Sequence, residues 1–228
     1  MTAPLIDIVS ATRRPEAGFW DDSPLAISLR RIAFDTRLAA HVSFANQRGL
    51  PEVYNARLAA ADCAEYVVFV HDDVWLDDHY IADRIIEGLR VYEVIGVAGN
   101  RRRVAGQPAW AFVDDTFTWD HRDNLSGAVA HARRPFGAVS YFGPAPAACE
   151  LLDGVFLAAR ASVLRSRGVA FDPRFAFHFY DVDFCRTARE RGLRLGTWPI
   201  ALTHESGGVL GSPAWRAAYR VYRAKWGG

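Results

Sequence analysis

The hydrophobic pattern of the chain begins as short apolar runs separated by longer amphipathic segments. The run at 66–70 (YVVFV) holds five consecutive apolar residues, mostly β-branched or aromatic, and two carboxylates, Asp72 and Asp73, follow it closely. A short continuous apolar run is typical of a strand buried on both faces, as in a parallel sheet covered by helices. We therefore predict a strand that delivers an acidic pair to its C-terminal end, where open α/β sheets bind ligands. The alternative is an ordinary polar turn.

Alternating strands and helices are predicted for the first hundred residues. The pattern predicts strands at 5–9, 41–44, 66–70 and 94–98, the last closed by Gly99-Asn100, and helices beginning at Ser23-Pro24, after Gly49-Leu50-Pro51 and at about 78. Ser23 is the expected N-cap of the first helix, and Asp77 or Asp78 that of the third. Four alternations favour a doubly wound α/β sheet with right-handed crossovers.

The pattern changes after Arg101. Segment 107–143 is rich in Gly, Trp and Phe, and short runs at 128–132 and 138–142 predict antiparallel strands among irregular loops. Beyond it, we predict strands over 150–159, interrupted by Asp153-Gly154, and over 193–200, and helices over about 161–167, 181–191 and 213–226. Gly192 is expected to stop the second of these helices. Because no repeat or linker is visible, we expect one domain over 1–228.

Composition and charge narrow the classes of function. Half of the 228 residues are hydrophobic and the net charge is +1, which indicates a globular protein with no polyanion-binding surface and therefore no nucleic-acid partner. Three cysteines without metal spacing favour a reducing compartment. The N-terminus has no signal-peptide pattern, and no apolar run approaches the roughly 20 residues of a transmembrane segment. We expect a cytoplasmic location, with peripheral membrane contact left open.

Acidic and imidazole side chains stand at three element boundaries: Asp72 and Asp73, Asp181 and Asp183, and His204. Carboxylate oxygens and an imidazole nitrogen form a partial shell for Mg²⁺ or Mn²⁺, which phosphate oxygens and water would complete. Such a cation would neutralise charge on a departing diphosphate. Each residue alone has a plainer explanation, because single histidines are often structural and Asp181 is well placed to cap its helix.

Three motifs, in this order, resemble those of a family 2 glycosyltransferase of the GT-A fold. Segment 69–73 (FVHDD) stands where the family has its Asp-x-Asp. Segments 152–160, 168–175 and 180–192 resemble the acceptor-side block, in which a Glu-Asp-Val-Asp-Leu-Cys run opens a helix and this chain has YDVDFC. Segment 203–208 (THESGG) resembles the family's metal-binding histidine segment. The resemblance covers about 5–208, and the order and spacing of the motifs are more specific than any one of them.

The resemblance implies a GT-A fold, with a Rossmann-like nucleotide-sugar-binding half over about 1–100 and an acceptor and catalytic half over about 101–228. The central sheet would be mixed and flanked by helices. It also implies metal-assisted, inverting transfer of a sugar from a nucleotide-sugar donor to a hydroxyl acceptor, such as a growing surface polysaccharide or another glycan. Mn²⁺ or Mg²⁺ would be the cofactor.

Site residues carry over by motif position. Asp73 and His204 match the metal-binding residues, and Asp181 matches the general base. The donor-binding positions are Ser10, Thr12, Asn46, Asn55, His71 and Asp72, and the acceptor-side positions are Asp153, Gly154 and Trp119. Sugar stacking on Trp119 or Trp110 is one hypothesis; burial in the core is the other.

Two residues depart from the family pattern. His71 replaces the first Asp of Asp-x-Asp, which would change metal affinity or donor choice. Tyr180 replaces the usual Glu before the base, and without that neighbouring carboxylate we expect Asp181 to be more acidic. The usual Asp at the end of the second strand is also missing, with Asn46 the nearest candidate for base recognition.

Two other functions stay open at this stage. A nucleotidyltransferase of GT-A-like fold predicts a glycine-rich basic loop after the first strand, and segment 10–14 (SATRR) has the arginines without the glycine. A non-catalytic glycan-binding module of GT-A-like fold would account for His71 and Tyr180.

Overall fold

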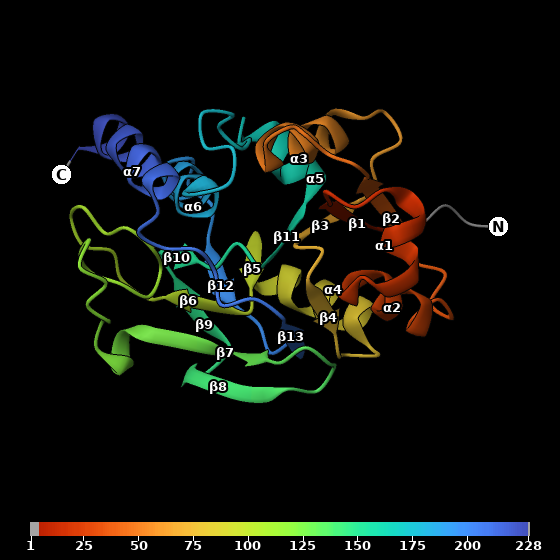
Figure 1. The fold of residues 1–228 in the computed structure, drawn as a ribbon. Coiled ribbons are helices and arrows are strands. Elements are labelled where there is room, and N and C mark those ends of the chain that lie inside the picture. Colours follow the sequence, from red (N-terminus) through yellow and green to blue (C-terminus); the bar gives the residue numbers. More distant parts are fainter. Residues whose placement is uncertain (1–4, 228) are drawn as a thin grey trace.

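The computed structural model describes residues 5–227, which form two β-sheets with helices packed around them (Figure 1). The seven-stranded sheet has the order β2-β1-β3-β11-β5-β12-β9. Its strands are β1 (Ile6–Ala11), β2 (Leu38–Ser43), β3 (Tyr66–Val70), β5 (Val94–Gly96), β9 (Ala147–Cys149), β11 (Phe156–Arg160) and β12 (Leu195–Thr197). The six-stranded sheet has the order β10-β6-β7-β13-β4, with β8 paired to β7. Its strands are β4 (Val74–Leu76), β6 (Ala98–Asn100), β7 (Leu125–His131), β8 (Ala138–Gly143), β10 (Leu151–Leu152) and β13 (Leu202–His204).

The first half of the chain builds the parallel part of the larger sheet. Strand β1 lies between β2 and β3 and is parallel to both, whereas β11 is antiparallel to β3 and β5. All five residues of β3 are buried, which confirms a strand covered on both faces. The helices are α1 (Glu16–Asp22), α2 (Pro24–Arg31), α3 (Leu50–Ala59), α4 (Ile81–Val91), α5 (Ala161–Ser166), α6 (Tyr180–Glu190) and α7 (Pro213–Trp226), and a 3-10 turn spans Arg122–Asn124. The mixed α/β fold class is therefore confirmed.

Within residues 5–227, the chain crosses between the two sheets at six short links. They are 71–73 between β3 and β4, residue 97 between β5 and β6, 144–146 between β8 and β9, residue 150 between β9 and β10, 153–155 between β10 and β11, and 198–201 between β12 and β13. The prediction of a single strand over 94–98 is wrong because Val97 is such a link, and Gly99 and Asn100 continue as β6 instead of closing the strand. The single strand over 193–200 is wrong for the same reason. His204 is the last residue of β13.

The predicted helix caps need correction. Ser23 occupies the N-cap position of α2, but its hydroxyl donates to the carbonyl oxygen of Asp72 at 2.8 Å instead of capping the helix. Asp77 does not cap α4 either, because its buried carboxylate accepts a hydrogen bond from the Thr203 hydroxyl at 2.6 Å. Asp78 accepts from the backbone N–H of Tyr80, the N-cap residue, at 2.8 Å.

An aromatic cluster fixes α6 against the larger sheet. Phe69 of β3 packs against Tyr54 of α3 with ring centroids 4.8 Å apart, and Phe171 stacks on Phe184 of α6 at 4.2 Å. Each of these fully buried side chains contributes about 1.5–3 kcal/mol by leaving water. The cluster therefore holds the start of α6, including Tyr180 and Asp181, at a set position. Within residues 5–227, no helix has both the length and the apolar character required to cross a bilayer.

Candidate active site

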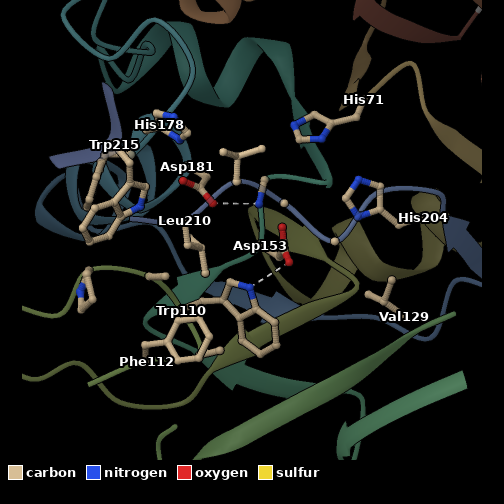
Figure 2. Close-up of a pocket in the computed structure, with 18 of the residues that line it drawn as sticks. His71, Trp110, Phe112, Val129, Asp153, His178, Asp181, His204, Leu210 and Trp215 are labelled. Carbon is tan, nitrogen blue, oxygen red and sulfur yellow. Dashed lines mark hydrogen bonds between the residues drawn. The ribbon is translucent and has the colours of Figure 1, made fainter. Parts of the chain in front are cut away.

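A cavity of about 510 Å³ lies where the links between the sheets meet the start of α6. Its lining includes six residues predicted from the sequence: His71, Trp119, Asp153, Gly154, Asp181 and His204. Figure 2 shows two carboxylates, those of Asp153 and Asp181, in the middle of the cavity. They lie between Trp215 of α7 on one side and His71 and His204 on the other. Trp110 lies below them and points its indole nitrogen at Asp153. Residues far apart in the sequence thus converge on one concave, largely aromatic site.

The three side chains of His71, Asp73 and His204 form a compact cluster. Strand β13 pairs antiparallel with β4, and the N–H of Glu205 donates to the carbonyl oxygen of Asp73 at 3.0 Å. This pairing brings His204 Nε2 within 3.3 Å of Asp73 Oδ1, and His71 Nδ1 lies 4.0 Å from the same oxygen. One ligand atom from each residue lies within 4.8 Å of the others. A single divalent ion can bridge groups at this spacing.

The charges of the cluster suit a cation. Burial acts to raise the pKa of Asp73, but the hydrogen bond and charge of His204 outweigh it, and the pKa falls to about 2. Burial acts to lower the pKa of His204, but Asp73 reverses this and the pKa is raised. Burial lowers the pKa of His71. At neutral pH Asp73 is therefore ionised and His71 is neutral, which are the metal-binding forms of these groups, whereas His204 has to release any proton that it holds when a cation binds.

Asp181 is the second residue of α6, and its Oδ2 accepts a hydrogen bond from the N–H of Gly154 at 3.0 Å. Burial and the negative charge of Asp153 raise its pKa to about 6. The expectation of a more acidic Asp181 is therefore wrong. Tyr180 brings no charge, but Asp153 supplies a neighbouring carboxylate from a different link. A carboxylate with a pKa near 6 is ionised at neutral pH and still basic enough to accept a proton in general base catalysis.

Asp153 is held in place from two sides. Its Oδ2 accepts from the Trp110 indole N–H at 2.8 Å, and its Oδ1 accepts from the N–H of Val155 at 2.9 Å. Trp110 is 9% exposed, so much of its surface is core, whereas Trp119 is 54% exposed and stacks on Phe142 with centroids 6.1 Å apart. Trp119 therefore presents an accessible aromatic face at this cavity, and Trp110 acts mainly as a buried donor to Asp153.

The remaining predicted donor residues do not line this cavity. Thr12 and Asn46 lie together beyond the C-terminal ends of β1 and β2, because the N–H of Asn46 donates to the Thr12 carbonyl at 2.8 Å. Ser10 is fully buried, and its hydroxyl has no hydrogen-bond partner within residues 5–227. The carbonyl oxygen of Asp72 accepts from Ser23. The Asn55 amide bonds to both backbone groups of Phe171, at 2.7 and 3.0 Å. Donor contact by these residues stays a prediction.

Tyr180 is a residue that the sequence reasoning left without a role. Its ring is 3% exposed, and its hydroxyl lies 2.8 Å from His71 Nε2 and donates to the Gly154 carbonyl at 2.7 Å. The only signal in the sequence was its position before Asp181, in place of a glutamate. Asp183, also left open, is a structural residue, because its buried carboxylate accepts from Lys225 Nζ and from the Trp226 indole at 2.7 Å.

Several solved structures match the chain at low sequence identity. GalNAc-T7 with UDP, GalNAc and Mn²⁺ matches with a TM-score of 0.53 and 11% identity, over 99% of this chain and 48% of that chain. The mannosyltransferase PcManGT from Pyrobaculum calidifontis, in complex with GDP-Man and Mn²⁺, matches with a TM-score of 0.48 and 16% identity, over 100% and 66%. The catalytic domain of Drosophila beta1,4galactosyltransferase 7, in complex with xylobiose, matches with a TM-score of 0.45 and 12% identity, over 84% and 63%. The chain thus spans between about half and two thirds of these proteins.

The match to GalNAc-T7 supports the GT-A fold, and the fold alone, because the identity is low. No curated protein matches the sequence. A sequence-family model described as "Glycosyltransferase like family" matches residues 32–205. This range takes in most of the chain, including the cluster at 71–73, the Asp153-Gly154 link, Asp181 and His204. The chain therefore belongs to the glycosyltransferase like family.

Proposed function

We propose that this protein transfers a sugar from a nucleotide-sugar donor to a hydroxyl acceptor, with a divalent cation at Asp73 and His204 and with Asp181 as the general base. The observation that carries the proposal is the geometry of one cavity. Its lining contains a histidine of the cation-binding cluster and a carboxylate whose pKa is raised to about 6. A transferase of this class needs a bound cation to stabilise the leaving diphosphate and a base to accept the proton of the acceptor hydroxyl.

The residues present fit Mn²⁺ or Mg²⁺. A carboxylate oxygen suits both ions, an imidazole nitrogen suits Mn²⁺ better than Mg²⁺, and the remaining positions suit phosphate oxygens. When bound, the cation supplies positive charge that stabilises the departing nucleoside diphosphate. GalNAc-T7, which shares the fold, binds UDP and Mn²⁺, and this supports the same donor chemistry here.

The protein's own groups account for the rest of the reaction. Asp181 accepts the proton of the acceptor hydroxyl, and the oxygen attacks the anomeric carbon from the face opposite the diphosphate, so the configuration inverts. The N–H of Gly154 fixes the carboxylate of Asp181 at 3.0 Å. Asp153 and Trp119 line the acceptor side, where an aromatic face suits the apolar face of a sugar ring. A glycan such as a surface polysaccharide is the proposed acceptor.

The wider assignments follow from this function. We assign the donor half of a single GT-A domain to about 1–100 and the acceptor half to about 101–228. The cysteines Cys63, Cys149 and Cys185 are all free, which fits a reducing compartment and supports the proposed cytoplasmic location.

Donor turnover tests the proposal directly. A panel of nucleotide-sugars is incubated with the protein and Mn²⁺ or EDTA, and released nucleoside diphosphate is measured for the wild type, for Asp181→Asn and for Tyr222→Phe, a control whose side chain does not line the cavity. We expect cation-dependent release with at least one donor, lost in the Asn variant. Release that is independent of metal, or full activity in Asp181→Asn, argues against the mechanism. Pyrophosphate release from nucleoside triphosphates would instead favour a nucleotidyltransferase.

A further inference from the structure

The two residues that depart from the family pattern are in direct contact. His71 stands in place of the first Asp of Asp-x-Asp and Tyr180 in place of the Glu before the base, 109 positions later in the chain. The distance from His71 Nε2 to the Tyr180 hydroxyl oxygen is 2.8 Å. Tyr180 is 3% exposed, and the aromatic cluster around Tyr54 and Phe171 confines its ring. The contact therefore joins a buried tyrosine, whose position is set by packing, to a partly buried histidine.

The hydrogen bonds determine which nitrogen of His71 carries the proton. The Tyr180 hydroxyl has one hydrogen, and it donates this hydrogen to the Gly154 carbonyl oxygen at 2.7 Å, since a carbonyl can only accept. The hydroxyl oxygen must then accept from His71, so Nε2 of His71 carries the hydrogen. In the neutral ring the lone pair is on Nδ1. Nδ1 is the atom that lies 4.0 Å from Asp73 Oδ1, within the cluster.

We propose that His71 is a third protein ligand of the divalent cation, through Nδ1, and that Tyr180 is a positioning residue that fixes its tautomer and ring orientation. This proposal rests on the cation site of the proposed function and adds to it a ligand of a different chemical class. Metal-bound histidines commonly donate their second ring N–H to an oxygen, which orients the ring and makes the ligand nitrogen more basic. The Tyr180 hydroxyl fills that role.

The ligand set has consequences for metal choice. Two imidazole nitrogens and one carboxylate favour Mn²⁺, Co²⁺ or Zn²⁺, whereas Mg²⁺ favours an all-oxygen shell. Three protein ligands also hold an ion more firmly than two. The protein should therefore bind Mn²⁺ before any nucleotide is present, and it should prefer Mn²⁺ to Mg²⁺.

Gly154 links this arrangement to the base. Its carbonyl accepts from Tyr180, and its N–H donates to Asp181 at 3.0 Å. A continuous hydrogen-bonded path thus runs from His71 through Tyr180 and Gly154 to Asp181. His71 and Tyr180 together thus join the cation site to the base through the backbone of Gly154.

The experiment measures metal binding to the full chain without nucleotide. Free Mn²⁺ is quantified by its EPR signal during a titration, and pulsed EPR reports the imidazole nitrogens bound to the ion. The variants are His71→Ala, His71→Asp and Tyr180→Phe. Tyr222→Phe is the matched control, because it removes the hydroxyl of another buried tyrosine, one that accepts from Arg186 at 3.2 Å. A thermal melt of each variant verifies folding.

We expect two coordinated imidazoles in the wild type and one in His71→Ala. Tyr180→Phe should weaken Mn²⁺ binding by about 10-fold or more, the usual effect of losing a group that orients a metal ligand, and Tyr222→Phe should not. His71→Asp should lower the ratio of Mn²⁺ to Mg²⁺ affinity. If His71→Ala does not fold, the other two variants carry the test.

Three results would overturn the proposal: no Mn²⁺ binding without nucleotide, an unchanged imidazole count in folded His71→Ala, or identical affinities for Tyr180→Phe and Tyr222→Phe. Sugar transfer, measured separately, distinguishes this failure from that of the proposed function. If sugar is transferred and the His71 variants bind the metal as the wild type does, only the proposal that His71 is a third ligand is refuted. If Mn²⁺ binding depends on His71 but no donor supports transfer, only the proposed glycosyltransferase activity is refuted.

Discussion

Replacing Asp181 by Asn should change stability and activity in opposite directions. The amide keeps the shape of the side chain, and its oxygen can still accept from the N–H of Gly154, but the group no longer ionises. Burial and Asp153 raise the pKa of Asp181 from 3.8 to about 6, so the fold disfavours the ionised form by about 3 kcal/mol.

The sign of the pH dependence follows from proton binding. The native state holds the Asp181 proton more tightly than the unfolded chain does, so this group lowers the free energy of unfolding as pH rises from about 4 to about 6. Above pH 6 the cost is constant. The Asn variant has no such cost, so its stability relative to the wild type should increase by up to about 3 kcal/mol between pH 4 and pH 7.

Urea unfolding of both proteins across this pH range, in EDTA, gives the difference directly, because groups that titrate alike in the two proteins cancel. Asp123→Asn, on a side chain that is 88% exposed, is the matched control for the loss of a carboxylate. In parallel, kcat/KM of the wild type should rise with pH through about 6, and the Asn variant should lose about 100-fold or more. A stability difference that does not vary with pH would refute the assigned pKa. A wild-type activity profile with no limb near pH 6 would refute the role as base.

Three further substitutions test the supports of the site. In Gly154→Ala the new Cβ would lie 2.7 Å from Tyr180 Cζ and 2.8 Å from Asp181 Cβ, so kcat/KM should fall by about 100-fold. The control Gly18→Ala, whose new Cβ has no contact closer than 3.6 Å, should leave kcat/KM unchanged. Equal activities of the two variants would show that the link 153–155 moves to accommodate the methyl group. Trp119→Ala should raise the acceptor KM by about tenfold, equivalent to about 1.4 kcal/mol of binding, and should leave the melting temperature unchanged. An unchanged KM would show that Trp119 does not stack on the acceptor. Lys225→Met leaves the fully buried carboxylate of Asp183 without its cation and should destabilise the fold by about 3 kcal/mol in urea unfolding. Adding Asp183→Asn should recover most of that loss, and failure to do so would mean that Lys225 acts through packing.

Much of the fold was predictable because its hydrophobic pattern is local. The buried run of β3 and the amphipathic helix α7 have the bounds that the pattern predicts, and the hairpin of β7 and β8 differs only at its ends. The two strands predicted with wrong bounds lie at the links between the sheets. Val94–Asn100 reads as one apolar run followed by a turn, yet Val97 passes the chain from one sheet to the other. The residues before and after such a link are all buried, so the hydrophobic pattern continues across it. Hydrophobicity alone does not indicate which sheet a strand belongs to.

The residue types at element boundaries suggested a cation site, but only the family resemblance specified that Asp73 and His204 share it. No local pattern relates Asp73 to His204, because they meet through the pairing of β4 with β13, and strands of three residues carry too little periodicity to specify a partner. The donor side shows the opposite case. Asn55 stood at a plausible position, but both sides of its amide already bond to the backbone of Phe171, a contact across 116 positions.

Asp181 shows why a single substitution next to a site is a poor guide to its electrostatics. Losing the glutamate at position 180 suggested a more acidic base, and that inference counted only the nearest neighbour in the sequence. In the fold, Asp153 from the link between β10 and β11 supplies a negative charge, and burial of the start of α6 adds a larger effect in the same direction. Position 180, which has no glutamate in this chain, instead carries a tyrosine whose hydroxyl forms a hydrogen bond with His71 near the cation cluster. The two departures therefore have to be interpreted as a pair: a carboxylate at 180 could not give a hydrogen to the Gly154 carbonyl, and an aspartate at 71 could not give one to Tyr180.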